Sequence, residues 1–281
     1  MIRRLALIAL CCVACGKETF LAAAFVQTPS LPNPVDPSGN IPPFQVITAY
    51  LGTIDTTDPT KIDPGKEAPI TDAIASVSFM HGGTDPRWLE SGWTQSDGTY
   101  TLSSKDEPLL TFEPGTPYTL VLETKDGDAF GARFTPGPAI DIQEFVGSTC
   151  TIALPPPLPP YNAPRCHDGS LSGITRTDAA VNGTFSPAFV IVGRIDPNNP
   201  SAEPQITYKF MPQSADELLK YVLSDRPYRL QKFDIPASAY PQSGYYLVTL
   251  LSIKQGKVSS NAFLGSTALA GTGVAGIVHV P

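Results

Sequence analysis

Three polar side chains stand close together in the segment 167–178 and have the types needed for a hydrolytic site. Ser172 lies five residues after His167, and either Asp168 or Asp178 could supply the carboxylate. A serine nucleophile needs a histidine base that a carboxylate orients. A nucleophile elbow also requires Gly-x-Ser-x-Gly on a turn into a helix, whereas this segment reads Gly-Ser-Leu-Ser-Gly with no helical pattern after it. The spacing favours a polar loop and leaves a hydrolase as the second alternative function.

The histidines and the glycine-rich segment 271–276 do not predict a metal or cofactor site. His81, His167 and His279 are the three histidines, and none has metal-ligand spacing to another or to a carboxylate cluster. The segment 271–276 matches Gly-x-Gly-x-x-Gly, but dinucleotide binding needs a following helix and an acidic residue about 20 residues later. Neither follows in this sequence. We expect a tightly packed last strand there, with no cofactor and no metal.

Three aromatic residues are the best candidates for a ligand surface: Trp88, Trp93 and Tyr100. Sugar rings stack on aromatic faces, so a glycan- or peptidoglycan-binding module is the first alternative function. Cross-strand aromatic pairs also build hydrophobic cores. A two-residue turn at Asp97-Gly98 would place Trp93 and Tyr100 on one face with Leu102. The pattern therefore favours core packing for Trp93 and leaves the role of Trp88 open.

The first eighteen residues carry the strongest functional signal. Arg3 and Arg4 precede an apolar run over 5–13, and Val-Ala-Cys-Gly follows, with its cysteine at position 15, just before Lys17. A membrane-spanning helix needs roughly 20 apolar residues, so this run predicts a cleaved signal rather than a permanent anchor. The segment resembles the signal of bacterial lipoproteins, in which the apolar stretch is removed and the new N-terminal cysteine is acylated.

The resemblance to bacterial lipoproteins implies lipidation at Cys15 and a membrane partner reached through the lipid. It departs from the family pattern at Cys12, where lipoproteins usually carry leucine. An ordinary signal cleaved at Ala22-Ala23-Ala24 is the alternative, but it would place Lys17 in the apolar region, where a charge costs about 2.5 kcal/mol or more. Gly16, rather than aspartate, follows Cys15, which by resemblance implies the outer membrane.

Charge and cysteine usage restrict the partners further. The chain has 19 basic and 26 acidic side chains and a net charge of −7 at pH 7, which becomes about −9 once the signal and its two arginines are removed. Polyphosphates repel such a chain, so we expect no nucleic-acid partner. Cys150 and Cys166 remain besides Cys15, and in an oxidising periplasm they predict one disulfide. Another envelope protein or a glycan is the expected partner.

Proline marks two spacers and so predicts the domain organisation. Six prolines between positions 27 and 43 are typical of a polyproline-II tether, and the run Leu-Pro-Pro-Pro-Leu-Pro-Pro over 154–160 cannot be a central strand. The predicted parts are a signal peptide over 1–14, a lipid anchor and tether over 15–43, a first β-sandwich over 44–148, a linker over 149–183 and a second β-sandwich over 184–281.

Both halves show short apolar strands separated by turn signals. Asp97-Gly98 is the signal of a two-residue hairpin turn, and a second Asp-Gly at 126–127 is expected to join the strands 118–125 and 129–134. Ser214 and Glu217 form a capping box, which predicts one short helix in the second half. The predicted strands cover residues 44–51, 75–80, 93–95, 100–103, 118–125, 129–134, 185–195, 205–211, 244–251 and 277–280.

The strand that begins at Tyr118 and the one that includes Tyr245 give each half a Gly-Tyr-strand-turn pattern. This pattern resembles immunoglobulin-like and fibronectin type III-like sandwiches. The resemblance implies an all-β fold of two antiparallel sandwich domains in tandem and carries no activity. The sequence as a whole predicts a non-enzymatic outer-membrane lipoprotein without catalytic residues, serving scaffolding, adhesion or envelope assembly.

Overall fold

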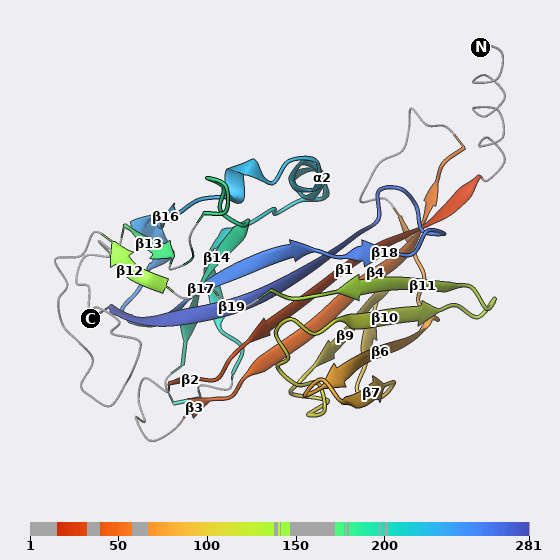
Figure 1. Cartoon of the computed structure of the whole chain (residues 1–281), viewed down its shortest axis with the longest axis horizontal. Helices are drawn as coiled ribbons and strands as arrows, with labels where there is room; N and C mark the ends of the chain where they lie inside the picture. The colour runs from red at the N-terminus through yellow and green to blue at the C-terminus, as the bar shows by residue number, and fades with distance from the viewer. Residues whose placement is uncertain are drawn as a thin grey trace, which may run out of the picture.

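The computed structural model describes residues 16–32, 40–57, 67–137, 140, 142–146, 172–176, 178, 180–196, 198–199 and 202–280. The fold is nearly all β, with 54% of residues in strands and 6% in helices, which confirms the predicted all-β class. Figure 1 shows an elongated body whose longest strands run along its length. No described helix is both long and apolar enough to cross a membrane.

A nine-stranded sheet is the central element of the fold. Its strand order is β15-β14-β17-β19-β1-β4-β9-β8, with β5 paired to β4 beside this path. The strands are β1 (Lys17–Thr28), β4 (Phe44–Asp55), β5 (Ala68–Pro69), β8 (Thr94–Ser96), β9 (Thr99–Ser103), β14 (Ala188–Ile195), β15 (Gln205–Phe210), β17 (Gly244–Gln255) and β19 (Thr267–Val280).

Two smaller sheets pack against this long sheet. The remaining two strands form a separate two-stranded ribbon. The five-stranded sheet has the order β18-β11-β10-β6-β7, the three-stranded sheet β12-β13-β16, and β2 pairs with β3. These strands are β2 (Leu31–Pro32), β3 (Asn40–Ile41), β6 (Ile74–His81), β7 (Asp85–Leu89), β10 (Tyr118–Glu123), β11 (Ala129–Phe134), β12 (Ile142–Val146), β13 (Gly173–Arg176), β16 (Lys232–Asp234) and β18 (Lys257–Val258).

The short helix of the second half is where the capping box predicted it. Helix α2 (Ala215–Leu223) begins after Ser214, whose hydroxyl accepts a hydrogen bond from the backbone N–H of Glu217 at 3.2 Å. Its apolar face covers part of the long sheet around Phe189 and Leu251. Two 3-10 turns follow, η1 (Arg226–Tyr228) and η2 (Ala237–Ala239). The helix therefore caps one face of the sheet.

Strand β1 lies in the middle of the nine-stranded sheet, between β4 and β19. It pairs antiparallel with β4 along its whole length and parallel with β19 from Ala22 to Gln27. Leu21, Ala23 and Phe25 alternate into the core and are 0–5% exposed. The structure thus differs from the predicted tether over 15–43, because residues 17–28 have strand alternation and two pairing partners.

The molecule has two main hydrophobic cores. The first lies between the long sheet and the five-stranded sheet, where the Phe25 ring meets the Tyr118 ring at 4.4 Å between centroids. The second lies between the long sheet and the three-stranded sheet, around Ile174, Val190 and Phe233. Each half therefore has a sandwich-like core, and apolar burial of this kind is the main stabilising contribution.

The two cores share one continuous sheet. Strand β19 contributes Ala268 and Ala270 to the first core and Val274 and Val278 to the second. Strand β18, late in the chain, pairs with β11 of the first half. The predicted boundaries at 44–148 and 184–281 therefore do not separate the sheets, and the parallel β1–β19 pair departs from a wholly antiparallel arrangement.

The buried phenol of Tyr118 makes the stability of the first core sensitive to alkaline pH. Burial, with a smaller contribution from the Glu113 carboxylate, raises the pKa of Tyr118 well above its ordinary value of 10. As the pH rises through about 10, the unfolded chain loses this proton while the folded protein keeps it, so the free energy of unfolding falls. Below that pH both states hold the proton and the stabilising contribution is complete.

We therefore expect urea unfolding to show a lower free energy of unfolding at about pH 11 than at about pH 8, and a smaller loss in Tyr118→Phe. The ionisation of lysines and exposed tyrosines is common to both proteins and cancels in the comparison. An identical pH dependence in the two proteins would contradict the assignment to Tyr118.

Candidate functional site

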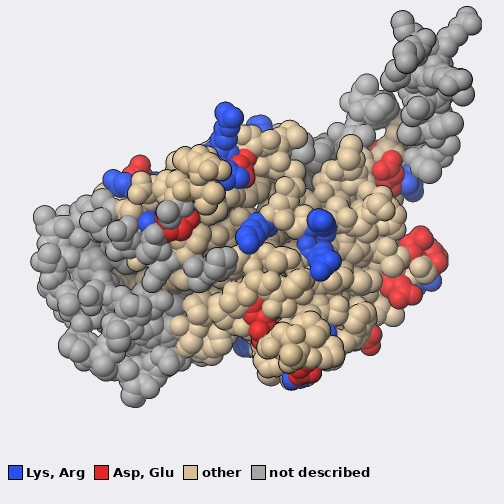
Figure 2. Space-filling model, in the orientation of Figure 1, with Lys and Arg blue, Asp and Glu red and all other residues tan. Residues whose placement is uncertain are grey.

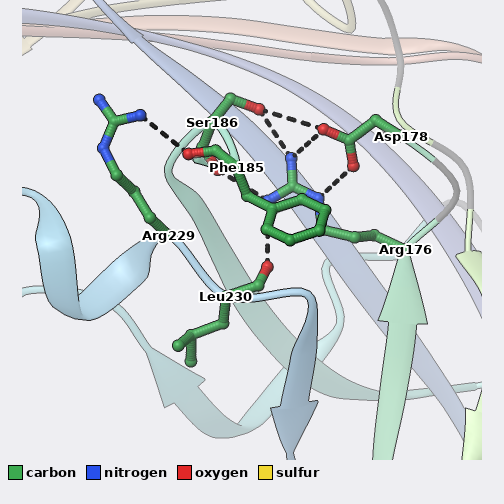
Figure 3. Close-up of polar contacts among 6 residues, drawn as sticks. All are labelled: Arg176, Asp178, Phe185, Ser186, Arg229 and Leu230. Carbon is green, nitrogen blue, oxygen red and sulfur yellow. Dashed lines mark hydrogen bonds and ion pairs between the residues drawn. The ribbon is translucent and has the colours of Figure 1, made fainter. Parts of the chain in front are cut away.

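A buried polar cluster surrounds Arg176, at the end of β13 (Figure 3). Its guanidinium is 0% exposed and lies between Asp178, Ser186 and the loop that precedes β16. The Phe185 ring lies 5.6 Å from the guanidinium carbon. A buried charge is costly unless it is paired and fully hydrogen-bonded, so the partners of Arg176 decide what the cluster does.

Every N–H group of Arg176 has an acceptor. Nε donates to Asp178 Oδ1, and Nη2 donates to Asp178 Oδ2 at 2.8 Å and to the Ser186 hydroxyl at 2.7 Å. Nη1 donates to the carbonyl oxygens of Ser186 at 2.7 Å and Leu230 at 3.3 Å. These are the five donors that a guanidinium has. Arg176 therefore ties together three chain segments and has no donor left for a ligand.

A second arginine supports the same region from a more exposed position. Arg229 pairs with Asp225 through two bonds of 2.6 and 2.7 Å and donates to the carbonyl oxygen of Phe185 at 2.8 Å. The hydrogen bonds that Arg229 donates to the Asp225 carboxylate are the main reason that the pKa of Arg229 is raised. Sequence reasoning assigned no role to either arginine, because an arginine with a nearby aspartate is common on protein surfaces.

The proposed hydrolytic segment 167–178 is only partly described. Asp178 has both carboxylate oxygens bound to Arg176, so it is engaged in a structural ion pair. The carbonyl oxygen of Ser172 accepts a hydrogen bond from the N–H of Ile235 at 3.1 Å. His167 and Asp168 lie outside the described residues, as do Cys15, Cys150 and Cys166. Because both of its carboxylate oxygens bind Arg176, Asp178 is unsuited to orient a catalytic histidine.

His81 makes the closest histidine–carboxylate contact in the described chain. Its Nδ1 lies 2.5 Å from Glu113 Oε1 and 3.1 Å from Thr111 Oγ1. A hydroxyl–histidine–carboxylate triad needs the carboxylate and the hydroxyl on different ring nitrogens. Here both meet the same nitrogen, so the cluster lacks the geometry of a triad.

The same cluster continues into the interior as a polar chain. The Glu113 N–H donates to Gln27 Oε1 at 3.2 Å, and Gln27 Nε2 donates to Thr272 Oγ1 at 3.1 Å. The Thr272 hydroxyl donates to the carbonyl oxygen of Gly137 at 2.6 Å. Gln27 and Thr272 are 0% exposed, so this chain satisfies polar groups inside the sheet at the β1–β19 junction.

The histidine positions do not form a metal centre in the described part of the chain. Asp85 lies opposite His81 in the β6–β7 pair, and its carboxylate pairs with the Arg87 guanidinium at 2.5 Å. No group of three histidine, cysteine, aspartate or glutamate side chains there could hold a metal ion. The ring of His279 stacks on Tyr245 at 4.5 Å between centroids.

The glycine-rich segment 271–276 lies within β19 rather than in a loop before a helix. A Cβ atom at Gly273 would lie 2.7 Å from Leu251 Cδ2 and 3.0 Å from Thr28 Cγ2. A side chain at this position would force Leu251 or Thr28 to move, so glycine allows close packing of neighbouring strands, which agrees with the predicted tightly packed strand.

The three aromatic candidates have three different environments. Tyr100 is 2% exposed, and its hydroxyl donates to the carbonyl oxygen of Ile70 at 2.8 Å. Trp93 is partly buried and packs against the first core. Trp88 is 58% exposed on β7, the edge strand of the five-stranded sheet. Of the predicted surface, Trp88 alone therefore presents an open ring face.

Two shallow cavities lie beside the edge strand β15. One has a volume of about 410 Å³ and is lined mainly by apolar residues including Tyr208 and Phe233, and the other, of about 340 Å³, lies between β15 and α2. Asp234 is the one carboxylate in the larger cavity. The smaller cavity is lined by Glu217, Lys220 and Ser224 among others. The Glu217 carboxylate there accepts a hydrogen bond from the backbone N–H of Gln213 at 2.6 Å, as expected at the start of a capped helix.

Comparisons with known proteins do not assign the chain to a family. No protein-family model matches it, and no curated protein matches it. Among solved structures, one match comes from work described as structural insight into host cell surface retention of a 1.5-MDa bacterial ice-binding adhesin. That match has a TM-score of 0.20 and 11% sequence identity, and it covers 94% of this chain and 66% of the other. Similarity at this level carries no argument about fold or function.

Proposed function

We propose that the protein is a non-enzymatic lipoprotein of the bacterial cell envelope, attached to the outer membrane through acylated Cys15. It would serve scaffolding, adhesion or envelope assembly. The observation that carries this proposal is the position of β1, which begins at Lys17, two residues after that cysteine. A signal cleaved before Cys15 leaves the whole of β1 in the mature protein.

Cleavage at the alternative site, Ala22-Ala23-Ala24, would divide the same strand. Cleavage after Ala24 would remove residues 17–24, the greater part of a strand that has partners on both sides. Both β4 and β19 would then present unpaired backbone groups in the interior, and unpaired buried backbone groups are rare in folded proteins. The fold therefore supports the lipoprotein-type cleavage over the ordinary one.

The position of β1 also changes how the protein would sit on its membrane. Two residues span about 7 Å in an extended chain. Because β1 replaces the first part of the predicted tether, the acylated residue would be next to the folded body rather than at the end of a long spacer. We therefore propose that the end of the body formed by the start of β1 and the end of β4 lies close to the lipid surface.

Replacing Cys15 by alanine is expected to release the protein from membranes. Two or more acyl chains hold a protein stably on a bilayer, and the alanine variant has none. Fractionation of expressing cells should find the wild type in the membrane pellet and Cys15→Ala in the soluble fraction. Because Cys15 precedes β1, the variant should unfold in urea at the same concentration as the wild type once both are in detergent.

Cys12→Ala is the matched control, because Cys12 belongs to the part that the proposal removes. It should stay with the membrane like the wild type. Membrane retention of Cys15→Ala would refute acylation at Cys15.

A further inference from the structure

The outer face of the five-stranded sheet carries an ordered row of side chains that the proposed anchoring does not use. Strand register places Trp88 opposite Ser78, Ser78 opposite Thr119, Thr119 opposite Arg133, and Arg133 opposite Lys257. These five residues, here called the cross-sheet row, come from β7, β6, β10, β11 and β18 in turn. The row therefore crosses the whole sheet at one level.

Side-chain alternation turns the cross-sheet row outward. The residues next to it along the strands, such as Val77, Leu120 and Ala132, are 0–2% exposed and belong to the first core. Successive side chains of a strand point to opposite faces, so the row lies on the face away from that core. Its middle members, Ser78 and Thr119, are short hydroxyl side chains and make a shallow floor between larger groups at both ends.

Trp88 provides an apolar wall at one end of the row. Its side chain is 58% exposed, and its indole Nε1–H donates to Glu90 Oε1 at 2.6 Å. That bond limits rotation of the ring while leaving a face open. A fixed, exposed indole at a sheet edge is suited to stacking against the apolar face of a sugar ring.

Two unpaired cations stand at the other end. Arg133 and Lys257 are directly opposite each other in the β11–β18 pair, and like charges in such positions repel. Neither makes an ion pair with a described carboxylate. Figure 2 shows basic groups in the middle of the visible face, in the area of β18, whereas acidic groups gather at its right-hand end. In a chain with a net charge of −7, this pair is a local attraction for an anion.

The spacing of these groups suits an extended ligand. Neighbouring strands lie about 4.8 Å apart, so about 14 Å separates Trp88 from Arg133 and about 19 Å separates it from Lys257. A ligand that contacts the whole cross-sheet row needs an apolar ring face for Trp88 and hydroxyl groups that hydrogen-bond to Ser78 and Thr119. It also needs a negative charge at the end where the two cations stand. An oligosaccharide with carboxylate, sulfate or phosphate groups has all three.

We propose that the cross-sheet row binds an acidic oligosaccharide, with Trp88 stacked on one sugar ring and Arg133 and Lys257 paired with its anionic groups. The proposal does not depend on acylation of Cys15. Of the three aromatic residues that the sequence suggested for a ligand surface, the proposal uses Trp88 alone. Tyr100 lies in the first core, and Trp93 packs against that core.

Two-dimensional amide NMR of the chain from Gly16 onward tests this directly, because the sequence holds two tryptophans and thus two indole N–H signals. The probes are tetragalacturonic acid and a heparin-derived hexasaccharide, and cellotetraose is the neutral control. We expect both acidic probes to shift the Trp88 signal and leave the Trp93 signal in place. Cellotetraose should bind about tenfold more weakly, and added salt should remove the difference.

Substitutions on and off the row provide the matched comparison. Trp88→Ala should weaken binding of the acidic probes about tenfold, and the double variant Arg133→Gln, Lys257→Gln about fivefold. Lys209→Gln removes an exposed cation from β15 of the nine-stranded sheet, away from the cross-sheet row, and should leave the affinity unchanged. The proposal is overturned if neither acidic probe shifts the Trp88 signal, if neutral and acidic probes bind alike, or if Lys209→Gln weakens binding as much as the double variant.

Discussion

Replacing Arg176 by alanine is expected to lower the free energy of unfolding by about 3–5 kcal/mol, the loss typical of a buried ion pair that loses one partner. The substitution removes five hydrogen bonds at once and leaves the Asp178 carboxylate, whose side chain is 25% exposed, without its cation. It also removes the donor to the carbonyl oxygens of Ser186 and Leu230 in the cluster of Figure 3. Urea unfolding followed by tryptophan fluorescence measures the loss.

Arg229 is the matched control for this experiment. It makes a similar ion pair with Asp225, but its side chain is 32% exposed and water can replace part of what is lost. Arg229→Ala should therefore cost about 1 kcal/mol or less through its ion pair. Arg176→Lys should fall between the two, because lysine keeps the charge without the planar donor geometry. A loss below about 1 kcal/mol for Arg176→Ala would show that the cluster is not structural.

A shortened chain that begins at Phe25 is expected not to fold, whereas one that begins at Gly16 should fold fully. The shorter chain lacks Leu21 and Ala23, which are 0% and 5% exposed in the first core, and lacks most of the pairing between β1 and β4. Loss of Leu21 alone should cost about 2–5 kcal/mol, and a typical domain has only about 5–15 kcal/mol to lose.

Near-ultraviolet circular dichroism and urea titration distinguish the two chains. The chain that begins at Gly16 should give a strong dichroic signal and a cooperative unfolding transition in urea. The chain that begins at Phe25 should give a weak dichroic signal and a gradual transition. A Phe25 chain as stable as the Gly16 chain would remove the main support for cleavage before Cys15.

The elements that the sequence predicted well are those whose signals are local. Asp97 and Gly98 have positive φ angles of 48° and 75°, as a type I′ turn requires, and the hairpin places Gln95 opposite Tyr100. The capping box at Ser214 is likewise formed. Turn chemistry and capping depend on neighbouring residues, so a single sequence is enough to recognise them.

Strand β1 was missed because its evidence lies far away in the chain. Its three consecutive alanines favour strands weakly, and they directly follow a segment with the features of a signal. Its parallel partner β19 is some 245 residues away, as the bond between Gln27 and Thr272 shows. Pairing over such a distance leaves no periodic signature, so the sequence could not predict that one sheet joins both halves.

The candidate surfaces were predictable in part for the same reason. The hairpin turn correctly brought Trp93 and Tyr100 to one face, and the exposure of Trp88 was left open until the structure placed it on an edge strand. Arg133 and Lys257 are 124 positions apart in the sequence, and only the pairing of β11 with β18 makes them neighbours. Arg176 was missed because burial, rather than its own sequence context, gives it its role.

Intact-mass spectrometry of the mature protein, purified from bacterial membranes in detergent, tests the central claim most directly. Acylation at Cys15 predicts a chain that begins at Cys15 and carries the added mass of its acyl groups, and this mass should disappear after chemical or enzymatic removal of the lipid. A mature chain that begins at Cys15 without lipid, or one that begins near Phe25, would contradict the proposed anchor.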